Sequence, residues 1–436
     1  MKKNLNDWLL WQEKLHLSEI DLGLDRIRKV AKALNLLSPS FPIITVAGTN
    51  GKGSTVAFLD SILRAQNYKT GAYTSPHLVD YNERIVLNGE QADDNTIIAA
   101  FEAIDKARCS VTDEQGNIQT VSLTYFEFST LAAIYIYQQQ NVDVAILEVG
   151  LGGRLDAANL WDASLAIITS IGVDHIDWLG DDREQIAIEK SGIMRKGVTA
   201  VCGDLDPPST IASEAKRIGA KLQQINAEFS FDPPENKSAK NWHWRNQDES
   251  FDFDLPSLSG DFQLNNAATA IAGLFAIKSL LPVTFEAINT GLSKAKVTGR
   301  LQILKTNPEW LIDVAHNPHA ALQLAKYIKQ NPAKGKTYAL FSMLRDKEIS
   351  EVLEIMNDVI DEWHIVATEG PRGLTLTELN ASFGERKQQS QALSTVVSHN
   401  SYDEACDVLK NITKDKDRVV AFGSFLVISK ILDNCK

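Results

Sequence analysis

The chain has 436 residues, of which 44% are hydrophobic and 23% are charged, and its formal net charge is −12. A chain of this length exceeds what one hydrophobic core usually supports, so two or three domains are expected. Binding to a nucleic-acid backbone needs an excess of positive charge, and the acidic balance therefore argues against nucleic acid as a partner.

The first 36 residues are expected to be mainly helical. Trp8 and Trp11 share one face of a first helix, and a second amphipathic helix is predicted over residues 24–36. Between them lies the segment IDLGLDR, residues 20–26, which combines apolar side chains, a glycine and flanking acids. On the residues alone, this segment is either a plain connection between helices or a binding loop.

The first predicted strand, residues 42–47 (PIITVA), runs directly into the glycine-rich segment GTNGKGST, residues 48–55. The glycines let the backbone approach a phosphate, the lysine supplies positive charge, and the serine offers a hydroxyl to magnesium at the start of the following helix. Val46 stands where the strict GxxxxGK[ST] pattern has its first glycine, and an extra glycine separates the lysine from the serine. A variant phosphate-binding loop is predicted; the alternative is an ordinary strand-to-helix turn.

A second short strand is predicted at residues 69–73, followed by a loop that contains Ser75 and His77. In doubly wound sheets, ligands bind at the carboxyl ends of the strands, so these two side chains are placed where a nucleotide or a metal can meet them. A simple Ser-Pro turn is the alternative. Residues 123–140 have the apolar spacing of a helix.

Two further buried strands end in residues that suit a metal site. Residues 142–147 lead into Glu148, and an acid at the tip of a parallel strand beside a phosphate loop is where a magnesium ligand belongs. Residues 165–169 form the next strand, and Asp174 and His175 lie just past its end. His175 is either a metal or phosphate contact or a structural histidine.

The alternation of helix and strand continues from residue 182 to residue 225. The helix over residues 182–191 carries Lys190, which on the residues alone is most simply a solvated surface lysine. Residues 227–260 change to a short polar and aromatic alternation, which predicts antiparallel edge strands.

Two helices, over residues 262–281 and 284–293, precede a domain boundary near Thr298. A second parallel α/β domain is predicted beyond it, with Asp313 at the tip of one strand, where a ligand site is expected. Its predicted strands are residues 301–305, 310–314, 337–341, 363–367 and 418–422.

The cysteines are scattered and include no CxxC pair, so neither a disulfide framework nor a zinc site is expected. This cysteine usage predicts a cytoplasmic protein. They are Cys109, Cys202, Cys406 and Cys435. Charged residues interrupt the N-terminal stretch that a signal peptide would need, and no run of about 18 apolar residues predicts a membrane span. A monomer is expected.

Seven motifs, in this order, resemble those of the folylpolyglutamate synthase/dihydrofolate synthase family, whose members are Mur-ligase-like, ATP-dependent amide-forming enzymes. The motifs are AGTNGKGS (47–54), LEVGLGGRLDAAN (147–159), DH (174–175), EKSGIMR (189–195), NNAATA (265–270), TGR (298–300) and DVAHNPHA (313–320). The resemblance spans nearly the whole chain and implies an α/β fold in two parts. A P-loop-containing Mur-ligase-like domain with pterin-site loops is expected over residues 1–298, followed by a smaller Rossmann-like ligase domain over residues 299–436.

The resemblance also implies roles for individual residues. ATP is expected to contact Gly51, Lys52, Gly53, Ser54, Asn266, Arg300 and Asp313. Magnesium is expected to contact Ser75, Glu148 and His175. Dihydropteroate is expected to contact Ile20, Asp21, Leu22, Gly23, Leu123, Thr124, Tyr125, Phe126, Leu155, Asp156 and Ala157. The expected catalytic residues are Lys52, His175 and Lys190. The last of these is expected to be carbamylated, which turns a cation into an anion that can help to hold a second magnesium ion.

By the same resemblance, the chain is expected to join L-glutamate to dihydropteroate, giving dihydrofolate, and to add further glutamates to reduced folates. It would use ATP, one or two magnesium ions and an acyl-phosphate intermediate. The segments at residues 20–26 and 122–128 resemble the bifunctional form rather than the polyglutamate-only form, which stays the first alternative. A cell-wall Mur ligase needs a further N-terminal domain, for which the 41 residues before the phosphate loop are too few. A nucleotide switch needs a strict Walker loop and a guanine-reading [NT]KxD tetrapeptide, which the chain lacks.

Overall fold

The computed structural model describes residues 2–18, 20–112, 115–236, 238–368, 370, 372–387 and 395–434; Cys435 lies outside them. The chain divides into two compact units. Unit 1 comprises Met1–Ser257 and Gln263–Lys296, and unit 2 comprises Leu258–Phe262 and Val297–Lys436. Each unit has its own main sheet and its own hydrophobic core.

An eight-stranded sheet forms the centre of unit 1, in the order β10-β9-β8-β1-β7-β2-β3-β4. Its strands are β1 (Ile43–Ala47), β2 (Thr70–Tyr73), β3 (Ile85–Leu87), β4 (Glu90–Gln91), β7 (Val144–Glu148), β8 (Leu165–Ile168), β9 (Thr199–Cys202) and β10 (Lys221–Gln224). All pair in parallel from β10 to β2, whereas β3 and β4 are antiparallel. Every residue of β1, β7 and β8 is buried, as expected of a parallel sheet covered on both faces. Because β1 lies between β7 and β8, the loops after these strands leave the same edge of the sheet.

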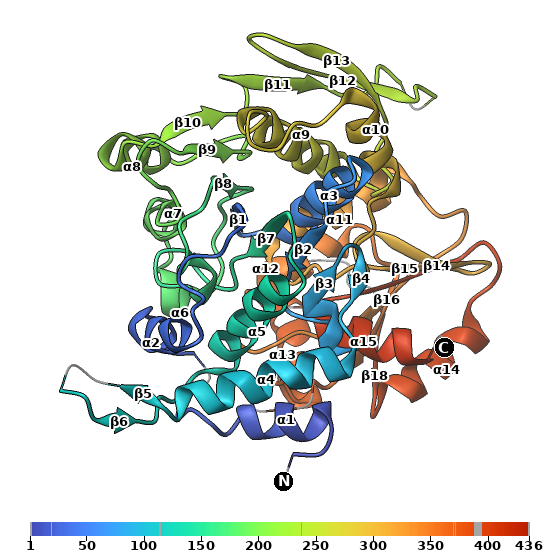
Figure 1. Ribbon diagram of the computed structural model, residues 1–436. Helices are drawn as coiled ribbons and strands as arrows, with labels where there is room; N and C mark the ends of the chain where they lie inside the picture. The colour runs from blue at the N-terminus through green and yellow to red at the C-terminus, as the bar shows by residue number, and fades with distance from the viewer. Residues whose placement is uncertain are drawn as a thin grey trace. The chain divides into compact units, whose positions relative to one another are not determined.

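Helices pack on this sheet, and α4 runs along α5 (Figure 1). The helices are α1 (Leu5–Gln12), α2 (Asp25–Ala33), α3 (Lys52–Ala65), α4 (Asp94–Arg108), α5 (Tyr125–Gln139), α6 (Ile176–Leu179), α7 (Arg183–Ser191), α8 (Ser209–Ile218), α9 (Asp261–Ala276) and α10 (Phe285–Lys294), with the 3-10 turns η1 (Tyr81–Arg84) and η2 (Ala157–Asn159). α5 is apolar on most of its surface and is accordingly buried. Its start is fixed by a capping box, in which Thr124 and Glu127 satisfy each other's backbone N–H groups. A small hairpin, β5 (Val111–Thr112) and β6 (Ile118–Gln119), separates α4 from α5.

The aromatic segment that was expected to supply edge strands forms a separate sheet instead. It is antiparallel, as predicted, and consists of β11 (Phe229–Asp232), β12 (Asn241–Asn246) and β13 (Ser250–Asp254). Aromatic side chains of this sheet pack against the neighbouring helices α9 and α10. The ring of Trp244 stacks on Phe275 of α9, with ring centroids 5.0 Å apart.

Unit 2 has a six-stranded sheet in the order β14-β15-β19-β16-β17-β18. Its strands are β14 (Gln302–Thr306), β15 (Glu309–Ile312), β16 (Thr337–Phe341), β17 (Glu362–Val366), β18 (Thr395–His399) and β19 (Arg418–Phe422). Its helices are α11 (Pro318–Gln330), α12 (Ile349–Asn357), α13 (Leu376–Lys387), α14 (Tyr402–Ile412) and α15 (Phe425–Asn434).

The prediction of a wholly parallel second sheet is wrong. β14 is antiparallel to β15, because only Asn307 and Pro308 join them, and so short a link permits only a hairpin. The strand β18 was not predicted. Within the described residues it pairs with β17 alone, and of its own residues only the last is buried. Its sequence, TVVSH, lacks the apolar run of a central strand.

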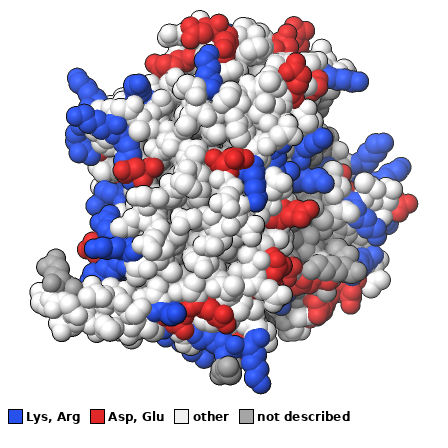
Figure 2. Space-filling view, in the orientation of Figure 1, with Lys and Arg blue, Asp and Glu red and all other residues white. Residues whose placement is uncertain are grey.

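Figure 2 shows basic and acidic side chains interspersed on the face drawn, with uncharged surface between them. Within the described residues, no helix has both the length and the apolar composition to cross a membrane.

Candidate active site

The glycine-rich segment forms a tight turn from β1 into α3, at the carboxyl edge of the sheet. Gly51 caps α3 with a φ of 88°, in the left-handed region that favours glycine. The amine of Lys52 donates hydrogen bonds of 3.0 and 3.1 Å to the backbone oxygens of Gly48 and Thr49. The lysine therefore folds over the loop, at a helix N-terminus that attracts anions. These features match a phosphate-binding loop.

Two side chains from α9 lie against this turn. A Cβ atom on Gly51 would stand 2.5 Å from Oδ1 of Asn266, so this predicted ATP contact does lie beside the phosphate loop. Gln263 was not predicted: its Nε2 donates to the hydroxyl of Ser54 at 3.2 Å, and its Oε1 accepts from Asn266 at 2.9 Å. Gln263 precedes Asn266 by three residues, so helical spacing from Asn266 offered a signal that could have found it.

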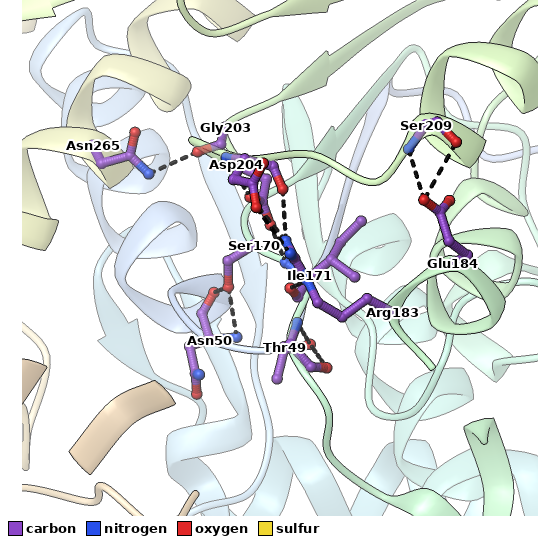
Figure 3. A network of polar contacts seen from close by, with 12 residues as sticks. Thr49, Asn50, Ser170, Ile171, Arg183, Glu184, Gly203, Asp204, Ser209 and Asn265 are labelled. Carbon is purple, nitrogen blue, oxygen red and sulfur yellow. Dashed lines mark hydrogen bonds and ion pairs between the residues drawn. The ribbon is translucent and has the colours of Figure 1, made fainter. Parts of the chain in front are cut away.

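The loop after β8 supports the phosphate loop from the other side (Figure 3). The N–H of Asn50 donates to the hydroxyl of Ser170 at 3.1 Å, and that hydroxyl donates back to the carbonyl of Asn50. The hydroxyl of Thr49 donates to the carbonyl of Gly172 at 2.9 Å and accepts from its N–H. The N–H of Thr49 also donates to the carbonyl of Ser170 at 2.7 Å, so several hydrogen bonds hold the two loops together.

A buried carboxylate fixes the loop after β8 in turn. Asp204, at the end of β9, accepts the N–H of Ile171 at 2.5 Å, and Arg183 at the start of α7 donates to the carbonyl of Ile171 at 2.8 Å (Figure 3). Neither residue was singled out in the sequence, because each belongs to no motif. Their effect on this loop depends on tertiary contacts, which include the ion pair of 3.5 Å between the two side chains. The same loop leads to His175, which caps α6 with a φ of 54°.

The structure brings Ser75 and Glu148, two of the predicted magnesium ligands, into contact. The N–H of Ser75 donates to Oε2 of Glu148 at 3.2 Å, and the same oxygen would lie 3.8 Å from a Cβ atom on Gly53. The acid thus lies between the loop after β2 and the phosphate loop. Among the described residues, no three His, Cys, Asp or Glu side chains form a ready metal site. Magnesium suits such a place, because it commonly binds one or two carboxylates and completes its shell with phosphates and water.

Lys190 is not the solvated surface residue that its helix position suggested. It is 3% exposed, near the end of α7. Burial and the charge of Lys52 lower the pKa of its amine to about 7, against the opposing effects of Asp174 and Asp156. A large neutral fraction makes this amine a better nucleophile than an ordinary lysine.

The three segments predicted to contact dihydropteroate lie side by side. The N–H of Gly23 donates to the carbonyl of Leu155 at 3.2 Å, and the ring of Phe126 covers Gly150, whose Cβ atom would stand 2.7 Å from the ring. Buried members of the predicted set are Leu123, Thr124, Asp156 and Ala157. Partly exposed members are Ile20, Asp21, Leu22, Gly23, Tyr125, Phe126 and Leu155.

The carboxyl group of Asp156 also has a local structural role. It caps η2 by accepting the N–H of Ala158 at 2.9 Å, and it accepts the N–H of Leu151 at 2.9 Å. Burial raises its pKa to about 7, although these hydrogen bonds act in the opposite direction.

Unit 2 holds the remaining predicted ATP contacts. Asp313, just after β15, is 7% exposed and accepts the N–H groups of Leu301 and Ala315, each at 2.8 Å. Burial raises the pKa of its carboxyl group, and the charge of Arg300 opposes that rise. The guanidinium of Arg300 lies 5.7 Å from the ring centroid of Phe425.

Comparisons with known proteins find two domain families in the chain. The Mur ligase middle domain matches residues 46–274, and the Mur ligase glutamate ligase domain matches residues 299–425. A dihydrofolate synthase/folylpolyglutamate synthase from Escherichia coli (strain K12) is 41% identical over 430 residues, which cover 98% of this chain and 95% of that protein.

Solved structures are similar over the whole chain. One is E. coli FolC in complex with DHPP and ADP, with a TM-score of 0.90, 40% identity, and coverage of 99% of this chain and 97% of that one. Another is the bifunctional folylpolyglutamate synthase/dihydrofolate synthase from Yersinia pestis with AMPPNP and a Mn ion, with a TM-score of 0.88, 38% identity, and coverage of 99% and 98%.

Proposed function

The chain belongs to the dihydrofolate synthase/folylpolyglutamate synthase family of Mur ligases, and from this premise we propose that it joins L-glutamate to dihydropteroate and extends reduced folates with further glutamates. The observation that carries the proposal is the meeting of the phosphate loop with Glu148, beside which lie the three segments expected to hold the pterin. This arrangement would bring an activating phosphate and a carboxylic acid substrate to one edge of the sheet.

A carboxylate is a poor electrophile, so the reaction has two steps. The carboxylate first takes the γ-phosphoryl group of ATP: a new P–O bond forms, the bond to the β-phosphate oxygen breaks, and ADP is released as leaving group. The glutamate amine then attacks the acyl carbon, loses a proton and displaces phosphate. Lys52 would offset the charge that develops on the transferred group, and the backbone N–H groups after Gly51 would hold the phosphates in line.

We further propose that Asn266, Arg300 and Asp313 contact the nucleotide, and that Ser75, Glu148 and His175 hold magnesium. The oxygen donors of the serine and the acid suit this hard cation. Bound magnesium would neutralise phosphate charge. A carbamate on Lys190, formed when its neutral amine adds to carbon dioxide, would supply a further anionic oxygen ligand. The burial and lowered pKa of this amine support the reaction.

The proposed enzyme works as a monomer in the cytoplasm, with its ATP-binding domain over residues 1–298 and its C-terminal domain over residues 299–436. The free thiols of Cys109 and Cys202 suit a reducing compartment. Purified protein incubated with dihydropteroate, L-glutamate, ATP and magnesium should yield dihydrofolate by mass spectrometry, and tetrahydrofolate in place of dihydropteroate should yield its diglutamate. Dihydrofolate absent from the first reaction but diglutamate present in the second would mean a polyglutamate synthase alone.

A further inference from the structure

Arg26, on the first turn of α2, contacts two of the segments expected to hold dihydropteroate. Its guanidinium lies 2.7 Å from the carboxylate of Asp21 and donates to the backbone carbonyl of the same residue at 2.6 Å. It also lies 3.3 Å from Oε1 of Glu127. One side chain therefore joins the segment at residues 20–26 to the segment at residues 122–128, about 100 residues later in the chain.

Glu127 connects Arg26 to the start of α5. Its side chain is 4% exposed, and it accepts the N–H of Thr124 at 2.8 Å in the capping box that starts α5. Thr124 is itself a predicted substrate contact, so a shift of the acid would move the backbone that presents this residue. Within the described residues, Arg26 is the cation paired with Glu127, and a buried carboxylate without a paired cation is costly.

A second side chain makes a parallel link. His16 lies between the same segments: its Nε2 is 3.0 Å from the carboxylate of Asp21, and its Nδ1 is 2.9 Å from the hydroxyl of Ser122. Asp21 is thus held from two sides, and the N–H of Gly23 ties its segment to Leu155. Hydrogen bonds and ion pairs thus connect all three segments in one network.

We propose that Arg26 is a positioning residue for dihydropteroate: by pairing with Asp21 and Glu127 together, it holds the substrate loops in the arrangement that the pterin requires. The proposal rests on the function proposed above. Loops that are ordered before binding lose less conformational entropy on binding, so the affinity for the substrate depends on this link. An arginine is suited to it, because a planar guanidinium can serve two carboxylates at fixed angles, whereas a lysine amine is a single point charge.

The test compares Arg26→Met with Arg28→Met, two changes on the same helix. Arg28 is a matched control, because its side chain is 53% exposed and its nearest acid, Asp25, is 3.9 Å away and 96% exposed. For Arg26→Met, the KM for dihydropteroate should rise about tenfold or more, while the KM for ATP stays within about twofold of the wild-type value. The KM for tetrahydrofolate should rise less than that for dihydropteroate, and Arg28→Met should leave all three values unchanged.

The outcomes separate the two proposals. A wild-type protein that forms no dihydrofolate would overturn the proposed function, whatever the variants do. If the wild-type protein forms dihydrofolate and folded Arg26→Met has an unchanged KM for dihydropteroate, the proposed role of Arg26 is wrong. An equal rise in the KM for ATP would also overturn that role, because it would indicate a general loss of structure. If Arg26→Met does not fold, Arg26→Lys takes its place: it keeps the charge but not the double contact, and a wild-type KM for dihydropteroate in this variant would also refute the role.

Discussion

The backbone N–H of Ser75 donates a hydrogen bond of 3.2 Å to Oε2 of Glu148, and this contact joins the loop after β2 to the last residue of the neighbouring strand β7. The same oxygen lies next to Gly53 of the phosphate loop. The side chain of Glu148 therefore has a fixed direction before any nucleotide binds, which is what a metal ligand beside a phosphate site requires.

Glu148→Gln and Lys52→Ala should each lower ATP-dependent ligation by about two orders of magnitude or more, because each removes a charge that acts on the transferred phosphoryl group. The unfolding transition should change little, since both side chains lie at the rim of the sheet. Mass spectrometry of the product measures the ligation, and thermal melting followed by circular dichroism measures the stability. Turnover near the wild-type rate in either folded variant would contradict the assignment of the phosphate site.

Gly51→Ala should raise the KM for ATP about tenfold or more. Its φ of 88° disfavours any side chain, and the new methyl group would lie 2.5 Å from Oδ1 of Asn266. Gly116→Ala is a matched control: it has a similar φ of 85°, but nothing lies within 4 Å of its Cβ position. Both variants should lose about 1 kcal/mol of stability to backbone strain. Only Gly51→Ala should raise the KM for ATP. An equal KM for ATP in the two variants would show that the contact between residue 51 and Asn266 does not influence ATP binding.

The sequence was sufficient to predict the glycine-rich turn after β1 and the polar strand tips that surround it, because each couples a buried apolar run to a polar residue or a glycine at its end. Glu148 and Asp313 were found in this way. Gln263 and Asp204 were not. Gln263 bonds to the side chains of Ser54 and Asn266, and Asp204 accepts backbone N–H groups, and such contacts follow from tertiary packing rather than from local pattern.

The local sequence pattern also led to wrong predictions of which side chains are buried. Lys190 lies on a helix whose charged neighbours suggested solvent, yet it is 3% exposed, because the face of α7 it occupies packs inward. The strand β18 was missed for the converse reason: it lies at the edge of a sheet and needs little apolar surface. Both errors concern which face of an element is covered, and this depends on elements far away in the sequence.

Lys190→Ala should lose most of the ligase activity and regain part of it when a small carboxylate such as acetate is supplied. The added anion would replace the oxygens of the proposed carbamate. Lys196→Ala is the control, because Lys196 is exposed just beyond the same helix. Wild-type protein depleted of carbon dioxide should also lose activity and recover it with bicarbonate. A density map of the active, nucleotide-bound enzyme with an unmodified amine at Lys190 would refute the carbamate.

The stability of unit 2 should fall between about pH 6.5 and pH 4 because of His364. Its ring stacks on His399 at a centroid distance of 5.0 Å, with Nδ1 2.8 Å from Nε2 of the neighbour, and burial lowers its pKa from 6.5 to about 4. In this range the unfolded chain takes up a proton that the folded unit resists, so acid favours unfolding, by roughly 1 to 3 kcal/mol in all. Melting curves of His364→Phe should have a weaker pH dependence over this range than those of the wild type. Equal slopes would contradict the effect.

Asp156→Asn should separate the two roles of this buried carboxyl group. The asparagine keeps an oxygen that can accept the N–H of Ala158, so the turn η2 should persist, whereas Asp156→Ala leaves the N–H groups of Leu151 and Ala158 without this partner and should cost about 1 to 3 kcal/mol. If Asp156 contacts dihydropteroate, the asparagine variant should raise the KM for this substrate about tenfold while the KM for ATP stays nearly constant. Asp162→Asn, at a residue whose side chain is 85% exposed, is the control for a lost charge nearby. A wild-type KM for dihydropteroate in Asp156→Asn, together with lower stability in Asp156→Ala, would mean that Asp156 only caps the turn, because substrate binding would then be indifferent to its charge.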